Sequence, residues 1–381
     1  MPASRRTLTD AERLDWLRLS RSENVGPVTF RQLLGRFGSA GAALAALPEL
    51  ARRGGLRKSL TLCPQAAAAR EVAALAALGA RLVAGIEPDY PEALAALDDA
   101  PPLLAVLGDP GVFRRPAVAV VGARNASANG MRLAETLARE LGAAGFVVVS
   151  GLARGIDGAA HRGSLDSGTV AVLAGGIDVV YPPENEALHR AIAGRGALIA
   201  EQPQGTQPQA RHFPYRNRLI SGLALGVVVV EAALRSGSLI TARLALEQGR
   251  EVFAVPGSPL DPRSRGANDL LRQGAVLVET AADVLAALEG MTRPSLTEPP
   301  APDFAPAGPA ATDDPELGEA RERIESLLGP TPVAVDELLR RCQVSAPVVG
   351  TVLLELELAG RLERHPGHRV SLLLTTPAHV P

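Results

Sequence analysis

The chain has 381 residues, 46% of them hydrophobic and 21% charged, which is enough for about two or three folded domains with buried cores. A formal net charge of −2 excludes a polycationic protein that coats nucleic acid by bulk charge, so any nucleic-acid site must be a local basic patch. Lys58 is the only lysine, which excludes a Walker-type phosphate loop and a Schiff-base lysine in the α/β region. Cys63 and Cys342 lie far apart in the sequence, so we expect neither a disulfide framework nor a cysteine metal cluster.

No apolar run reaches the roughly 18 to 20 residues that a membrane span needs. The first residues, MPASRRTLTDAERL, lack the apolar region of a signal peptide. We therefore expect a cytoplasmic protein with no membrane partner.

Residues 1–80 are predicted to form a small domain of short helices. The turn Asn-Val-Gly-Pro at 24–27, between two helical patterns, resembles a helix-hairpin-helix or SAM-like element. Such a turn can present backbone amides to a DNA phosphate. Because no basic face is concentrated there, we favour a helical accessory domain.

Residues 81–290 are predicted to form a Rossmann-like α/β domain with a mostly parallel sheet. The segment 81–111 alternates short apolar runs with proline pairs, and we expect a lead-in that packs against the first strand of the sheet. Continuous valine-rich strands with helical patterns between most of them, the first at about 129–141, are typical of a sheet covered on both faces. The strands are expected at 117–121, 146–149, 169–173, 197–200, 226–230, 251–255 and 275–278.

Residues 291–314 are rich in proline, alanine and acidic residues without periodicity, which predicts a linker. Residues 315–381 are predicted to form a winged helix. The pattern is a helix, then a helix-turn-helix, then a small hairpin. The elements are expected at 315–328, 335–341, 347–358, 362–364 and 370–374.

The candidate recognition helix of this winged helix carries Glu355 and Glu357 and no arginine or lysine. Carboxylates would be repelled by a phosphate-lined groove. We therefore favour a structural or protein-contact role for this domain over DNA reading.

Two adjacent strand-to-helix turns, at Gly122 and Gly151, are each followed by an arginine, Arg124 and Arg154. A helix N-terminus offers unpaired N–H groups and the positive end of the helix dipole, so each turn is a candidate phosphate site. A third such turn, Ser-Gly-Ser at 236–238, follows a later strand. Each could be a simple helix cap, but three at one sheet edge favour a ligand with several phosphates.

The segment RHFPYRNR at 211–218 concentrates three arginines, with no acid, beside Phe213 and Tyr215, in a chain with only 3% aromatic residues. Guanidinium groups for phosphates and flat rings for unstacked bases are the two ingredients of single-strand binding. The alternative is that Phe213 fills the core and the arginines are solvated. Asn217 could bond a base edge or a phosphate, or cap a helix.

Several titratable groups are candidates for chemistry. Asp157 and His161 are four apart on one predicted helix, but a third metal ligand of suitable spacing is missing, so a structural pair is favoured. Asp178 and Glu201 also end strands, and nothing in the sequence fixes their separation. No catalytic residue, metal ligand or cofactor is assigned.

An ordered series of motifs over most of residues 85–280 resembles the DNA-processing protein A family (DprA, also called Smf). The motifs are VGARNAS, SGLARGIDGAAH, AVLAGGIDVVYP, EQPQGTQPQARHFPYRNRLISGL, EAALRSGSLITARLA, REVFAVPG and GANDLLRQGA. The resemblance implies a non-catalytic, usually homodimeric protein that binds single-stranded DNA, shields incoming strands during natural transformation and helps to load the RecA recombinase. The flanking helical and winged-helix domains are similar to those of longer family members.

The resemblance also implies strand-binding residues. Ala123 stands where the family often has Ser or Thr, so one hydroxyl contact is missing, and Tyr215 occupies a variable position, so its role rests on its chemistry alone. The implied residues are Arg124, Ser150, Gly151, Arg154, Phe213, Arg216, Asn217, Arg218 and Ser238.

The alternative function is a nucleotide-processing enzyme with a Rossmann-like sheet, such as a phosphoribohydrolase. That group carries a PGGxGTxxE-type motif, whereas the matching place here is RSGSLITA, without the paired glycines and the glutamate. A dinucleotide oxidoreductase is weaker still, because no second glycine follows Gly122 at the required spacing.

Overall fold

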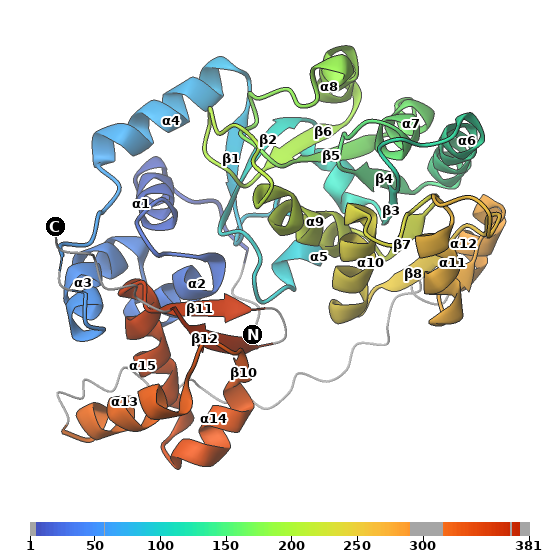
Figure 1. Ribbon diagram of the computed structural model, residues 1–381. Helices are drawn as coiled ribbons and strands as arrows, with labels where there is room; N and C mark the ends of the chain where they lie inside the picture. The colour runs from blue at the N-terminus through green and yellow to red at the C-terminus, as the bar shows by residue number, and fades with distance from the viewer. Residues whose placement is uncertain (1–4, 57, 290–314, 366–367, 374–381) are drawn as a thin grey trace, which may run out of the picture. The chain divides into compact units, whose positions relative to one another are not determined.

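The computed structural model describes residues 5–56, 58–289, 315–365 and 368–373 (Figure 1). The predicted linker at 291–314 lies outside the described residues. The chain divides into two compact units, one formed by 1–8 and 70–302 and the other by 9–69 and 303–381. Among the described residues, no helix is both long and apolar enough to cross a membrane.

The first unit is built on a nine-stranded sheet with the order β1-β2-β6-β5-β4-β3-β7-β8-β9. The seven strands from β3 to β9 are parallel, whereas β1 and β2 are antiparallel additions, so the predicted Rossmann-like, mostly parallel sheet is confirmed. The strands are β1 (Arg81–Ala84), β2 (Leu103–Gly108), β3 (Ala117–Val121), β4 (Val147–Ser150), β5 (Thr169–Leu173), β6 (Ala197–Ala200), β7 (Gly226–Val229), β8 (Glu251–Ala254) and β9 (Val276–Leu277).

The segment 81–111 does not pair with β3, the strand that it was expected to contact. This segment supplies β1 and β2, and β2 pairs with β6, an edge of the parallel sheet that is three strands away from β3. Its apolar run, buried from Leu103 to Val106, needs side-chain packing on both faces and a neighbouring strand for its backbone hydrogen bonds. The edge strand β6 of the parallel sheet is that neighbour.

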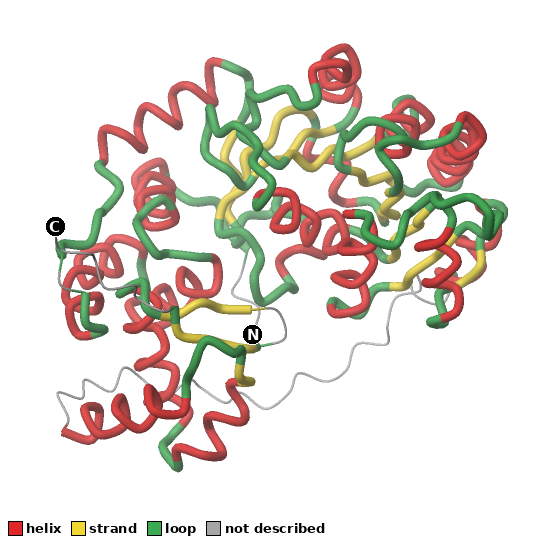
Figure 2. The backbone as a smooth tube through the Cα atoms, viewed as in Figure 1, coloured by secondary structure: helices red, strands yellow, loops and turns green. Residues whose placement is uncertain are grey.

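Helices cover both faces of the sheet (Figures 1 and 2). Strand residues alternate between two cores, so that Val118 and Val120 pack on α6, α7 and α12, while Ala119 and Val121 belong to the cluster that includes α9, α10 and α11. The helices of this unit that follow β1 are α5 (Glu92–Ala95), α6 (Ala128–Ala143), α7 (Ile156–Ser164), α8 (Glu186–Arg195), α9 (His212–Leu223), α10 (Gly237–Glu247), α11 (Arg265–Arg272) and α12 (Ala281–Leu288).

The strand order reverses at β3, which lies between β4 and β7. At such a switch point the loops that follow neighbouring strands diverge to opposite faces and leave a crevice at the carboxyl edge. The turns after β3, β4 and β7 are the three glycine- and serine-containing turns singled out in the sequence, and they share this edge.

The second unit contains N-terminal helices and the winged helix together. The predicted winged helix is confirmed, with its own core and with β11 and β12 as the predicted hairpin. A further short strand, β10, pairs with β12 and was not predicted, so the sheet has the order β10-β12-β11. The N-terminal helices are α1 (Asp10–Ser20), α2 (Pro27–Phe37) and α3 (Ala40–Arg53), followed by α4 (Gln65–Ala77), which runs on into the first unit. The winged-helix elements are α13 (Pro315–Leu327), β10 (Val333–Ala334), α14 (Val335–Cys342), α15 (Ala346–Leu358), β11 (Leu362–His365) and β12 (Arg369–Leu372).

Candidate functional site

A pocket of about 180 Å³ lies at the carboxyl ends of β3, β4 and β5. Its walls come from the turns that follow these strands, from the segment 179–184 and from the first turns of α9. The structure thus brings together five of the nine predicted residues, namely Arg124, Gly151, Arg154, Phe213 and Arg216.

Two aromatic rings and a guanidinium group form one wall of the pocket. The carbon of the Arg124 guanidinium lies 4.8 Å from the centre of the Phe213 ring, and the Tyr181 ring lies 5.8 Å from the Phe213 ring at 54°. Phe213 is half-buried and Tyr181 is 46% exposed, so both rings can be reached from solvent. A flat ring against a cation is a surface on which an unstacked base can settle.

Tyr181 was not singled out from the sequence, whereas Tyr215 was offered there as a second ring beside Phe213. Tyr215 is 59% exposed and does not line the pocket, because it lies two positions beyond Phe213 on α9 and so faces another way. The signal for Tyr181 was its place in the loop after β5, the same edge of the sheet, in a chain with few aromatic residues.

Arg216 forms the floor of the pocket and is only 6% exposed. Its Nη1 donates to the backbone oxygens of Gly151, at 2.6 Å, and of Val172, so it braces the carboxyl ends of β4 and β5. Burial lowers the pKa of Arg216 to about 10, while the nearby Asp157 carboxylate opposes that shift. The sequence suggested a phosphate contact, and the structure adds a bracing role that occupies part of the guanidinium.

Gly151 leaves room for this arrangement. A Cβ at this position would lie 2.5 Å from Nη1 of Arg216, so a side chain there would displace the guanidinium from its position. The glycine therefore lets the buried guanidinium approach the backbone. Its role is not conformational, because its φ is not positive.

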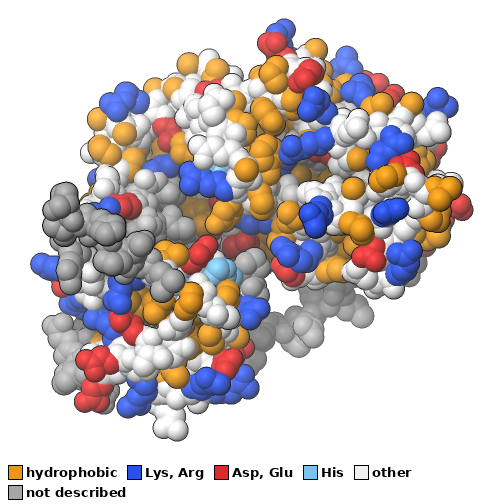
Figure 3. All heavy atoms as spheres, in the orientation of Figure 1, with side chains coloured by type: hydrophobic (Ala, Val, Ile, Leu, Met, Phe, Trp, Pro, Cys, Tyr) orange, Lys and Arg blue, Asp and Glu red, His pale blue; other side chains and the backbone are white. Residues whose placement is uncertain are grey.

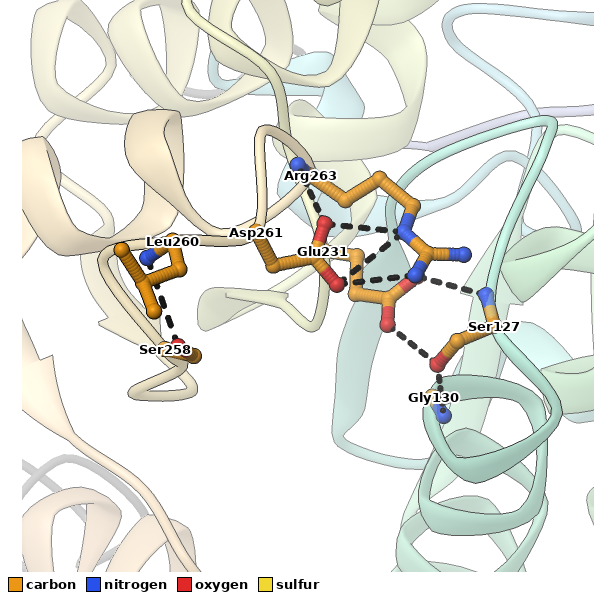
Figure 4. A network of polar contacts seen from close by, with 7 residues as sticks. All are labelled: Ser127, Gly130, Glu231, Ser258, Leu260, Asp261 and Arg263. Carbon is orange, nitrogen blue, oxygen red and sulfur yellow. Dashed lines mark hydrogen bonds and ion pairs between the residues drawn. The ribbon is translucent and has the colours of Figure 1, made fainter.

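In two of the three predicted phosphate-binding turns, carboxylates of the protein itself accept backbone N–H groups. Oδ2 of Asp157 accepts from the backbone N–H of Gly151 at 3.2 Å and of Ala153 at 3.4 Å. At the start of α6, the Glu231 carboxylate accepts from the backbone N–H of Ser127 at 2.9 Å and from its hydroxyl at 2.6 Å (Figure 4). These backbone donors therefore have partners within the protein, and phosphate binding at the two turns stays a prediction.

In the third turn, a serine hydroxyl accepts a backbone N–H at the start of the helix. Ser236 caps α10, with its hydroxyl accepting from the backbone N–H of Ser238 at 3.4 Å and lying 2.7 Å from the Ser238 hydroxyl. Nδ2 of Asn217 donates to the backbone oxygen of Gly237 at 3.2 Å, which ties α9 to α10.

Ser150 is fully buried and donates to the backbone oxygen of Val120 at 2.7 Å. Ser150, Asn217 and Ser238 do not line the pocket.

Arg218 also lies away from the pocket. Its Nη2 donates to both carboxylate oxygens of Glu201, at 2.6 and 2.7 Å, and its Nη1 donates to the backbone oxygen of Asp99 at 2.6 Å. Glu201 is therefore half of an ion pair, and Asp178, the other acid considered for hydrolysis, accepts from the backbone N–H of Gly205 at 2.8 Å. Both carboxylates have structural partners.

Asp157 and His161 are buried and have separate partners. Nδ1 of His161 lies 2.8 Å from the Thr169 hydroxyl, which itself donates to a backbone oxygen, so this nitrogen is the donor. Burial, with help from Arg216 and Arg162, lowers the pKa of His161 to about 3, and burial raises the pKa of Asp157. Within the described ranges, no cluster of His, Cys, Asp and Glu could hold a metal ion.

The exposed charges near the pocket are Arg154 and Glu184. Arg154 is 63% exposed on its side chain, and its Nη1 lies 3.6 Å from a Glu184 carboxylate oxygen. Such an exposed ion pair contributes little to stability and can be exchanged for another anion. On the face of the molecule drawn in Figure 3, basic and acidic side chains are interspersed, in line with the near-zero net charge.

Residues 81–289 match the family model for DNA recombination-mediator protein A. The chain belongs to that family. Residues 10–74 match the DprA-like N-terminal HHH domain, and residues 308–368 match the DprA winged helix domain. The resemblance to DprA and Smf proteins that the motifs indicated is confirmed.

Relatives of this family cover much of the chain. Protein Smf of Escherichia coli is 41% identical over 286 residues, which are 74% of this chain and 75% of that protein. DNA processing protein DprA of Streptococcus pneumoniae is 46% identical over 202 residues, which are 52% and 71% of the two chains.

Two solved structures of DprA proteins resemble the chain. The X-ray structure of the Streptococcus pneumoniae protein has a TM-score of 0.61 at 36% identity and covers 74% of this chain and 98% of its own. The structure of the Helicobacter pylori protein, whose title concerns its single-stranded DNA binding mode, has a TM-score of 0.51 at 30% identity and covers 56% and 96%.

Proposed function

We propose that this DprA-family chain binds single-stranded DNA at the pocket and performs no chemistry on it. The observation that carries the proposal is the stack of the Arg124 guanidinium on the Phe213 ring, next to Tyr181, at the mouth of a pocket with the exposed Arg154. An unstacked base packs on these rings, and the two arginines neutralise the adjoining phosphates.

The nine residues implied by the resemblance divide into two groups in this proposal. Direct contact with the strand is proposed for the exposed Arg124 and Arg154 and for the half-buried Phe213. The buried members support the pocket and the turns around it, and they are Ser150, Gly151, Arg216, Asn217, Arg218 and Ser238.

The test is a pair of variants measured by fluorescence anisotropy with a labelled oligothymidylate. Arg124→Ala combined with Phe213→Ala is expected to weaken binding at least about tenfold, equivalent to about 1.4 kcal/mol, because a stacking face and a phosphate contact are lost together. Tyr215→Ala is the control, since this ring is exposed but outside the pocket. Equal affinities for the two variants would overturn the assignment.

We further propose that the protein acts in the cytoplasm in natural transformation, protects incoming strands and loads the RecA recombinase. Family membership supports these roles. A homodimer is part of the same proposal, and the short edge strand β9, with Leu277 49% exposed, offers an apolar edge for a second copy.

The absence of chemistry is tested separately from binding. Incubation with nucleoside monophosphates is expected to release no free base, because Asp157 and Glu201 are committed to backbone and arginine partners. Release of a base at a rate that falls with substitution of Glu231 or Asp157 would instead favour the phosphoribohydrolase alternative.

A further inference from the structure

Helix α15, the second helix of the helix-turn-helix, is buried on two sides. Val349, Val352, Leu353 and Leu356 belong to the core of the winged helix. Leu354, Glu355 and Leu358 are at most 2% exposed, yet they lie outside that core. A helix that is apolar on two sides must be covered on both.

The second side of α15 is covered by α3 and α2 of the N-terminal helical domain, within the same compact unit (Figure 1). The end of α3 approaches the backbone of α15 closely. A Cβ at Gly54, at the end of α3, would lie 1.9 Å from the backbone oxygen of Glu355. This is the side of α15 that would have to enter a DNA groove in the usual winged-helix geometry.

Polar contacts join the same two surfaces, one at the hairpin turn of the helical domain and one at the end of α3. Nδ2 of Asn24, in that turn, donates to the backbone oxygen of Leu358 at 3.0 Å and so satisfies a carbonyl at the end of α15. Nη1 of Arg361 donates to the backbone oxygen of Gly54 at 3.3 Å.

A carboxylate of α15 lies beside the turn itself. Arg364 donates to Glu357 at 2.7 Å and to the Gln32 side chain at 3.3 Å, and so holds Glu357 next to α2. A Cβ at Gly26, the N-cap of α2, would lie 3.9 Å from Oε1 of Glu357. An internal anion therefore lies where a helix-hairpin-helix turn faces a DNA phosphate.

We propose that the winged helix is an intramolecular lid on the helical domain, and that this closed contact excludes the backbone of duplex DNA from the hairpin turn. In the closed state α15 is bound to α3, and Glu357 takes the place of a phosphate. Opening the lid exposes the turn to duplex DNA. The pocket for single-stranded DNA lies in the other unit and does not depend on the lid.

The composition of the contact suits a lid that opens. Glu355 is buried in it with its carboxylate paired to Arg321 of α13, so this ion pair lies within the winged helix. Closing the contact takes the pair out of water, which costs free energy and weakens the contact. The winged helix keeps its own core when the contact is released, because the apolar residues of that core lie on the other side of α15.

The test uses two variants of the full chain that open the contact in different ways. Gly54→Ala places a methyl group against the α15 backbone, at a position whose φ of −68° and ψ of −4° suit alanine. Leu354→Glu buries a carboxylate in the contact and adds no positive charge, so a gain in DNA affinity cannot come from the new side chain. Gly350→Ala is the matched control on α15, since a Cβ there meets no atom within 4 Å.

Hydrogen exchange of α3 and α15 reports opening, and anisotropy with a short duplex and with an oligothymidylate reports binding. Both opening variants are expected to exchange faster in α15 and to bind the duplex at least about fivefold more tightly, with unchanged oligothymidylate affinity. Faster exchange without tighter duplex binding would overturn the proposal. Unchanged exchange in both variants would also overturn it, because the contact would not be the one described.

Discussion

The Arg124 guanidinium lies on the face of the Phe213 ring, with 4.8 Å between its carbon and the ring centre. The two residues come from distant parts of the sequence, the turn after β3 and the start of α9. The reversal of strand order at β3 brings them to one edge of the sheet. This pair, with Tyr181 beside it, leads to predictions that separate binding residues from supporting ones.

Tyr181→Ala is expected to weaken oligothymidylate binding about three- to tenfold, because one of two stacking rings is lost. Tyr181→Phe keeps the ring and is expected to bind nearly as well as the natural protein. Anisotropy titrations of both variants at one salt concentration measure the difference. Equal weakening by both substitutions would indicate that the hydroxyl, and not the ring, makes the contact.

Arg154→Ala is expected to change the salt dependence of binding. Each phosphate contact to a single strand contributes about 0.7 to the slope of log K against log salt concentration, so losing Arg154 should reduce that slope by about 0.7. Thermal stability should hardly change, since its pair with Glu184 is exposed. An unaltered slope would show that Arg154 does not contact a phosphate of the bound strand.

Arg216→Ala is expected to lower the free energy of unfolding of the protein, because Arg216 supports the fold. The substitution leaves the backbone oxygens of Gly151 and Val172 without the Arg216 donor and removes the positive charge that most opposes the effect of burial on Asp157. Breaking a buried charge interaction of this kind costs about 3 kcal/mol or more. Urea unfolding of this variant beside Arg154→Ala measures the contrast, and equal stabilities would contradict the bracing role.

His161→Asn is expected to make the protein less sensitive to acid. The pKa of His161 is lowered from 6.5 to about 3 in the folded chain, so between these values the unfolded chain binds one more proton than the folded chain at this residue. The free energy of unfolding therefore falls as pH falls through this window, by up to about 1.4 kcal/mol per pH unit. Asparagine keeps a donor toward Thr169 but does not titrate.

Chemical denaturation at several pH values between about 4 and 7 measures this effect. The difference in slope between the natural protein and His161→Asn should approach one proton. Tyr215→Ala, which changes an exposed ring, should keep the full slope. Parallel pH profiles for all three proteins would mean that His161 titrates in the folded state as it does in the unfolded chain.

Much of the fold follows from local patterns in the sequence. The strand predicted at 117–121 is β3, and the helix predicted at about 129–141 is α6, Ala128–Ala143. Valine-rich runs and helical periodicity depend on neighbouring residues, so they can be recognised without knowing the fold. The segment 81–111 failed because the pairing of β2 with β6 is a contact between distant parts of the chain.

The amino-acid sequence by itself determined the sheet, the winged helix, the family and the turns that meet at one edge. Only the tertiary structure decided which charges are available there. It placed Glu231 and Asp157 at helix N-termini, buried Arg216, paired Arg218 with Glu201 and set Tyr181 beside Phe213. The physical reason is that burial and pairing depend on what lies across the fold, and a charged side chain of one type is a ligand contact when exposed and a structural brace when enclosed.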